Sequence, residues 1–153
     1  MSNMTPVIAL EKGAEILGVK LYPLGFTFSI VEQGKGSGGH FAVGAFTNGD
    51  REIRLWYRFE LGGVAYRKAD VERGHVEFMQ FLGLEDKSAF PGFGSGDPLA
   101  GFRRLLQDME HCGLFLEQNG EGFRSSMKNY VYRRKPTGFA ALSKHAKRIR
   151  DES

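Results

Sequence analysis

The chain has 153 residues, of which 41% are hydrophobic and 12% aromatic; this composition excludes a disordered chain and is typical of one globular domain with a real core. No apolar run approaches the ~20 residues of a membrane span, and the first residues lack a signal-peptide pattern, so we expect neither. The only cysteine, Cys112, excludes an internal disulfide and is typical of a reducing compartment, so the cytoplasm is the expected location.

Charge is distributed unevenly along the chain, although the net charge is only +3. Residues 1–123 contain 12 Lys or Arg and 16 Asp or Glu, a balance of −4, whereas residues 124–153 contain 9 and 2, a balance of +7. Such asymmetry indicates either an anionic partner for the basic part or docking of that part on the acidic remainder.

The first predicted element is a helix over residues 5–18. Thr5 followed by Pro6 is a typical helix start, because Thr can cap the first turn and Pro fits the first helical position. Apolar residues follow at helical spacing, and Gly18 is the expected end. We expect this helix to pack on a sheet.

The next part of the chain, residues 26–68, predicts four antiparallel strands connected as a meander. The strand over 51–61 has the clearest pattern, since apolar residues from Ile53 to Leu61 alternate with charged residues and Trp56. Alternation of this length predicts a sheet with one dry face and one wet face.

The turn at residues 47–49 determines the predicted register of the second and third strands. A three-residue loop there places Val43 opposite Ile53 and Phe41 opposite Leu55. A two-residue loop is the alternative, but it would set Val43 against a charged residue, so we prefer the longer loop.

The following turn, Gly62-Gly63, fits a two-residue hairpin loop. It would place Arg58 directly opposite Arg67, a like-charge pair that costs stability. The wet face would then gather arginine and tryptophan side chains from two strands. The residues predicted to contact a partner on this face are Arg54, Trp56, Arg58 and Arg67.

Two interpretations of this wet face remain open. In the first, Glu52 and Glu60 neutralise the arginines and Trp56 packs beneath a helix or loop. In the second, the face binds a partner, because exposed tryptophan and arginine side chains are typical anchors of protein–protein contacts.

The glycines between the first two strands form the spacing G-x-G-x-x-G at Gly34, Gly36 and Gly39. A dinucleotide-binding loop requires a helix directly after these glycines, but residues 40–43 continue as a strand. We therefore expect a mobile hairpin loop and predict no cofactor.

Two further helices are predicted after the sheet, over residues 70–84 and from Asp97-Pro98 to about Gly113. Asp108 falls on the wet side of the second helix, close to His111. These two residues could supply two metal ligands, but nothing nearby in the sequence supplies the others, so no metal site is predicted.

No catalytic residue is predicted, because the chain shows no convergent acid, base and nucleophile and no established catalytic motif. The expected protein is therefore not an enzyme. A deep pocket that holds His75 or His111 beside a carboxylate would indicate the opposite.

The last part of the chain, residues 123–153, is predicted to be a basic extension of a domain formed by residues 1–122. It could add a strand near 130–132 and a short amphipathic helix over 139–150, docked on the domain. The alternatives to docking are binding of an anionic partner such as nucleic acid and binding of a membrane surface. The residues predicted to contact an anionic partner are Arg133, Arg134, Lys135, Lys144, Lys147 and Arg148.

Several short segments carry a resemblance to a known group of proteins. They are Leu24-Gly25-Phe26, Gly38-Gly39-His40-Phe41, Arg58-Phe59-Glu60-Leu61-Gly62, and Phe90-Pro91-Gly92-Phe93 followed by Asp97-Pro98-Leu99. Their layout resembles small uncharacterised bacterial α+β proteins, some of which are similar to the immunity proteins that neutralise bacterial toxins. The resemblance covers about residues 5–116, and its turn and core motifs carry no catalytic residue.

The predicted fold is α+β: an N-terminal helix, a four-stranded antiparallel meander and two following helices packed on one face. The predicted function is that of a non-enzymatic, single-domain binding protein, immunity-like, which contacts a protein partner through the exposed sheet face. Nucleic-acid binding through the basic extension is the alternative. The oligomeric state is not predicted.

Overall fold

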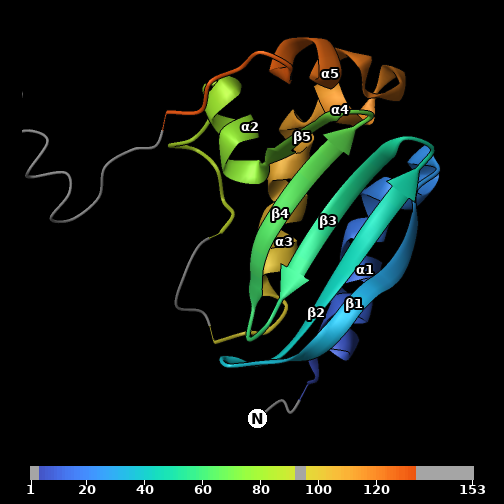
Figure 1. Ribbon diagram of the computed structural model, residues 1–153, viewed down its shortest axis with the longest axis vertical. Helices are drawn as coiled ribbons and strands as arrows, with labels where there is room; N and C mark the ends of the chain where they lie inside the picture. Colours follow the sequence, from blue (N-terminus) through green and yellow to red (C-terminus); the bar gives the residue numbers. More distant parts are fainter. Residues whose placement is uncertain (1–3, 92–95, 134–153) are drawn as a thin grey trace, which may run out of the picture.

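The computed structural model describes residues 4–91 and 96–133. It confirms an α+β fold with an antiparallel sheet, but the sheet has five strands rather than the four expected (Figure 1). The strands follow one another across the sheet in chain order. They are β1 (Thr27–Gly36), β2 (Gly39–Asn48), β3 (Arg51–Tyr57), β4 (Leu61–Lys68) and β5 (Val71–Gly74).

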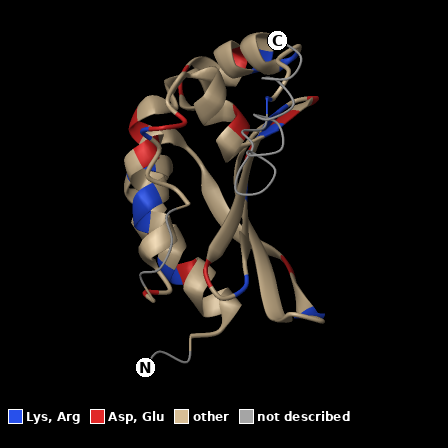
Figure 2. Ribbon diagram, turned by 90° about the vertical axis from the view of Figure 1, so that its left-hand side faces the viewer, with Lys and Arg blue, Asp and Glu red and all other residues tan. Residues whose placement is uncertain are grey.

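The described helices cover one face of this sheet. Helices α1 and α3 lie behind the strands, and α2, α4 and α5 gather at one end (Figure 1). Figure 2 shows the same arrangement from the side, with no described helix on the other face of the sheet. The helices are α1 (Pro6–Leu21), α2 (His75–Phe81), α3 (Ala100–Asp108), α4 (Gly113–Leu116) and α5 (Glu121–Met127), with short 3-10 turns at Tyr22–Leu24, Met109–His111 and Gln118–Gly120.

Helix α1 begins where the sequence predicts. The hydroxyl of Thr5 accepts a hydrogen bond from the backbone N–H of Ile8 at 3.2 Å, and Pro6 is the first helical residue. The predicted end at Gly18 is wrong, because the helix continues to Leu21. Gly18 instead provides space for a neighbouring ring: a Cβ atom there would lie 2.1 Å from the ring of Tyr22.

The predicted register of β2 and β3 is wrong. The turn consists of Gly49, with φ of +61°, and Asp50. Asn48 therefore pairs with Arg51, and Val43 pairs with Trp56. The shift is an odd number of residues and therefore reverses the two faces of β2. Ala42 and Phe46 face the core, whereas Val43 shares the outer face with Trp56.

The predicted register of β3 and β4 is also wrong. Strand β3 ends at Tyr57, which pairs with Leu61, so residues 58–60 form the connection between the strands. Arg58 therefore lies in a loop and does not face Arg67. The residue opposite Arg67 is Glu52, an opposite charge, so the expected like-charge repulsion does not exist.

The fifth strand replaces the start of a predicted helix. Residues 71–74 pair with the end of β4 as β5, after a turn in which Ala69 adopts φ of +54°. Only His75–Phe81 of the expected helix over 70–84 is α2. Residues 71–74 form backbone hydrogen bonds with β4. The helical spacing of apolar residues in the sequence does not indicate such tertiary pairing.

The core extends beyond the boundary predicted at residues 122/123. Helix α5 spans that boundary, and Phe123 and Met127 are fully buried among the aromatic rings of the core. The first residues of the predicted extension therefore pack as part of the domain.

A buried cation joins this end of the core to the sheet. Arg51 of β3 donates from Nη1 to the carbonyl oxygens of Phe115 at 3.1 Å and Leu116 at 2.9 Å, at the end of α4. Its guanidinium carbon lies 4.7 Å from the centroid of the Phe26 ring. These contacts satisfy two carbonyls that the end of a helix leaves without helical partners.

Candidate functional site

The first candidate site is the face of the sheet opposite the helices, here called the open face. Its central side chains are Arg54 and Trp56 from β3 and Arg67 from β4. Trp56 is 40% exposed to solvent. The structure thus brings three of the four predicted contact residues onto one face. Arg58, the fourth, lies beside them in the loop between β3 and β4.

An acidic residue holds the two arginines of the open face in place. Glu52 lies between them: Arg54 donates to its carboxylate at 3.2 and 3.3 Å, and Arg67 Nε lies 3.8 Å from it. Trp56 packs against Gly63 of β4, where a Cβ atom would lie 3.4 Å from its ring. Because their neighbours fix these side chains, little conformational entropy would be lost when a partner binds.

The glycines of the β1–β2 hairpin have a packing role that their spacing did not reveal. The expected mobile loop is instead a tight hairpin, with β1 continuing to Gly36 and β2 starting at Gly39. A Cβ atom on Gly38 would lie 2.0 Å from Nη1 of Arg58, and one on Gly34 would lie 3.1 Å from the Phe41 ring. The glycines therefore present bare backbone on which large side chains can lie.

These contacts create an aromatic end to the open face, here called the sheet corner: Phe41, Trp56, Arg58 and Phe59. It lies at the end of the sheet away from α2, α4 and α5 (Figure 1). All four residues line a hollow of about 380 Å³. Phe59 is 76% exposed, the most exposed large apolar residue of the described chain, because its strand ends two residues earlier.

Sequence reasoning assigned Phe59 to the dry face and Phe41 to the core, and so missed both. The alternation from residue 51 to 61 does not show where the strand ends. The Gly-Gly pair after Arg58-Phe59-Glu60 was the one sign in the sequence of a turn near this point, and hence of a connection between β3 and β4.

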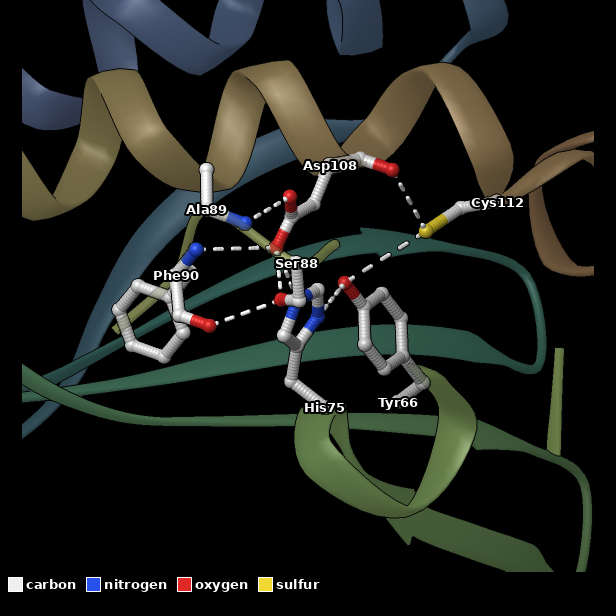
Figure 3. Close-up of polar contacts among 7 residues, drawn as sticks. All are labelled: Tyr66, His75, Ser88, Ala89, Phe90, Asp108 and Cys112. Atoms are coloured by element: carbon white, nitrogen blue, oxygen red, sulfur yellow. Dashed lines mark hydrogen bonds and ion pairs between the residues drawn. The ribbon is translucent and has the colours of Figure 1, made fainter. Parts of the chain in front are cut away.

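The second candidate site is a buried polar cluster between α2 and α3 (Figure 3). With its ring proton on Nε2, His75 accepts a hydrogen bond from the Tyr66 hydroxyl at Nδ1, at 2.8 Å, and donates one from Nε2 to Oδ2 of Asp108, also at 2.8 Å. The hydroxyl of Ser88 lies 2.5 Å from the same oxygen. Cys112 completes the cluster, with Sγ 3.9 Å from the Tyr66 hydroxyl oxygen.

Asp108 also binds the backbone of the loop after α2. The N–H of Ala89 donates to Oδ1 at 2.7 Å, and the N–H of Phe90 donates to Oδ2 at 3.1 Å. The prediction that Asp108 lies on the wet side of α3 is therefore wrong. Four donors converge on one carboxylate, which ties the loop to the helix.

Burial and hydrogen bonding set the protonation of this cluster. Burial by itself would raise the pKa of Asp108, but the hydrogen bonds from His75, Ser88 and the loop backbone outweigh it and lower this pKa from 3.8 to about 2. Burial raises the pKa of the Cys112 thiol to about 12. The thiol is therefore protonated at neutral pH and is a poor nucleophile.

The lowered pKa of Asp108 predicts a loss of stability in acid. A carboxyl group with a lower pKa in the folded state binds its proton more tightly when the chain is unfolded. Its contribution is complete above pH 3.8 and declines as the pH falls towards 2. Urea unfolding of the wild type and of Asp108→Asn should therefore converge in stability between pH 4 and pH 2, whereas a constant difference would contradict this assignment.

The cluster does place His75 beside a carboxylate, the arrangement that would indicate an enzyme if it lined a deep pocket. However, His75 is 2% exposed, and it lines neither the hollow at the sheet corner nor the groove between α1 and the β1–β2 hairpin. His111 lies outside the cluster, and no group of three or more potential metal ligands occurs within residues 4–91 and 96–133. The contacts of the cluster thus join α2, α3 and the loop between them.

The basic extension is described only to residue 133. The backbone N–H of Arg133 donates to Oε1 of Gln80 at 2.8 Å, and the hydroxyl of Tyr130 donates to the same oxygen at 2.6 Å. The other predicted contact residues of the extension lie outside the described residues: Arg134, Lys135, Lys144, Lys147 and Arg148. None of the helices that the structure describes is both long enough and apolar enough to cross a membrane.

Comparison with known proteins adds no relative. The chain matches no protein-family model, no curated protein and no solved structure.

Proposed function

We propose that the protein is a non-enzymatic binding protein, of an immunity-like kind, that contacts a protein partner through the open face and the sheet corner. The observation that carries the proposal is the position of Trp56. The only tryptophan of the chain is 40% exposed on a face that no described helix covers, and it follows Arg54 along the same face of β3.

The apolar surface at this position supports the proposal. Trp56 and Phe59 are large apolar residues with 40% and 76% of their surface exposed. They lie near the end of β3 and in the loop that follows it, and they line the corner hollow together with Phe41 of β2. Clustered aromatic and arginine side chains of this kind are the usual anchors of protein interfaces.

The charge arrangement also supports the proposal. Glu52 neutralises part of the arginine charge, as the first interpretation of the wet face expected, but Trp56 is not packed beneath any described element. Paired side chains keep a fixed geometry and still offer guanidinium N–H groups to a partner. The face is therefore suited to a specific contact rather than to simple solvation.

A capture experiment tests the proposal. The full chain is immobilised and exposed to a lysate of the organism that encodes it, in parallel with Arg54→Ala/Trp56→Ala. The wild type should retain a partner whose capture by the double variant falls at least about 30-fold, since the loss of even one anchor residue worth about 2 kcal/mol weakens affinity by that factor. The melting temperature of the variant should remain close to that of the wild type.

The matched control removes an apolar side chain elsewhere. Val19 lies on α1, on the other side of the molecule from the open face, and is 75% exposed. Val19→Ala should capture the partner as the wild type does. Equal capture by the wild type and the double variant would reject the open face as the contact surface.

A further inference from the structure

A groove adjoins the sheet corner on the side that faces α1. It is lined by residues 4–7, at and just before the start of α1, by the two strands of the β1–β2 hairpin, and by Arg58 and Phe59. Its volume is about 890 Å³, which is large enough for several side chains of a peptide. Phe41, Arg58 and Phe59 line both this groove and the smaller hollow of the corner, so the groove continues from the proposed contact surface.

The charged residues of the groove are all of one sign. Lys35 and Arg58 line it together with His40, and none of the described residues that line it is a carboxylate. The first turn of α1, which forms one wall, also contains no acidic residue. Over residues 4–133, by contrast, the charges nearly balance, with 15 Lys or Arg and 16 Asp or Glu. A local excess of cations within a nearly neutral domain favours an anionic ligand.

The remaining surface of the groove is mainly apolar. Phe59 stands at its edge with 76% of its surface exposed, and Val7 and Pro6 contribute aliphatic surface from α1. The hairpin glycines have no side chains that would cover this surface. At Gly39, a Cβ atom would have the Phe59 ring as its neighbour, at 3.6 Å. A ligand must therefore supply apolar surface as well as negative charge.

We infer that this groove binds an acidic segment of a protein partner that carries at least one large apolar side chain. The inference rests on the proposed function and specifies the chemistry of the partner. The apolar side chain would lie against Phe59 and Phe41, and carboxylates would pair with Lys35 and Arg58. Nucleic acid fits less well, because only two of the described residues that line the groove are permanently charged, whereas nucleic-acid binding relies on neutralising a row of phosphates.

Selection from a library of random dodecapeptides displayed on phage tests the inference on the full chain. The enriched peptides should combine acidic residues with a large apolar residue, and synthetic labelled copies should bind in fluorescence anisotropy with an affinity that falls as salt is added. Phe59→Ala and the charge reversal Lys35→Glu/Arg58→Glu should each weaken binding at least tenfold. The control Lys12→Glu/Lys87→Glu changes the net charge equally at exposed positions outside the groove and should leave binding within threefold of the wild type.

The other outcomes would overturn the inference. They are an absence of enriched peptides, enriched peptides without acidic residues, and binding that the groove variants do not weaken. Tighter binding of a single-stranded dT12 oligonucleotide than of the peptides would assign the groove to nucleic acid instead. Peptides that ignore the groove variants but lose binding to Arg54→Ala/Trp56→Ala would refute the groove alone and leave the open face as the contact surface.

Discussion

Asp108→Asn is expected to lower the free energy of unfolding by about 3 kcal/mol, because it leaves buried hydrogen-bond donors without acceptors. The carboxylate accepts from His75, Ser88 and the N–H groups of Ala89 and Phe90. An asparagine has one acceptor oxygen and would turn an NH₂ group towards some of these donors. The loop that follows α2 should then separate from α3.

Urea unfolding at neutral pH measures this effect, and Glu110→Gln provides the matched control. Glu110 is an exposed acid two residues further along the chain, so its loss should change the free energy of unfolding by less than about 0.5 kcal/mol. A change below 1 kcal/mol in Asp108→Asn would show that the cluster contributes little to the fold.

Arg51→Met should have the next largest effect on stability, a loss of about 2–3 kcal/mol. Methionine keeps the apolar part of the side chain but donates no hydrogen bond, so the carbonyls of Phe115 and Leu116 lose their buried partner. It also removes the cation that lies 4.7 Å from the Phe26 ring centroid. Burial lowers the pKa of Arg51, but arginine stays charged at any pH used for such measurements.

The control for this prediction is Arg124→Met. Arg124 of α5 forms an ion pair with Asp70 at 3.1 Å, and both side chains are exposed, so the pair should contribute less than about 1 kcal/mol. Thermal or urea unfolding of the two variants separates the buried arginine from the exposed one. Similar stabilities for the two variants would contradict the account of Arg51.

The alternation of side chains was sufficient to predict the sheet but not its register. Ile53, Leu55 and Tyr57 are buried as the period of two predicts. In β2, however, both faces are similarly apolar, so the pattern could not decide which one faces the core. The decision depends on distant contacts: Gly44 leaves room for the Phe28 ring, which would lie 2.6 Å from a Cβ atom there.

The candidate sites also divide into residues that the side-chain pattern could place and residues that only tertiary contacts place. Arg54, Trp56 and Arg67 could be assigned to one face because their neighbours along β3 and β4 alternate. Asp108 could not be placed, since helical periodicity alone puts it among the wet residues of α3. Only the tertiary arrangement brings His75 and the loop backbone to its carboxylate. Phe59 was missed because the end of a strand depends on pairing rather than on the pattern of residues.

The most direct test of the central claim uses the only tryptophan as a reporter. The full chain is labelled with 5-fluorotryptophan, which gives a single ¹⁹F resonance from Trp56, and is titrated with the captured partner. If the open face is the contact surface, the resonance should shift and the solvent exposure of the ring should fall on binding, as measured by the solvent isotope shift between H₂O and D₂O. A resonance that keeps its position and its solvent exposure while the partner binds would contradict the claim.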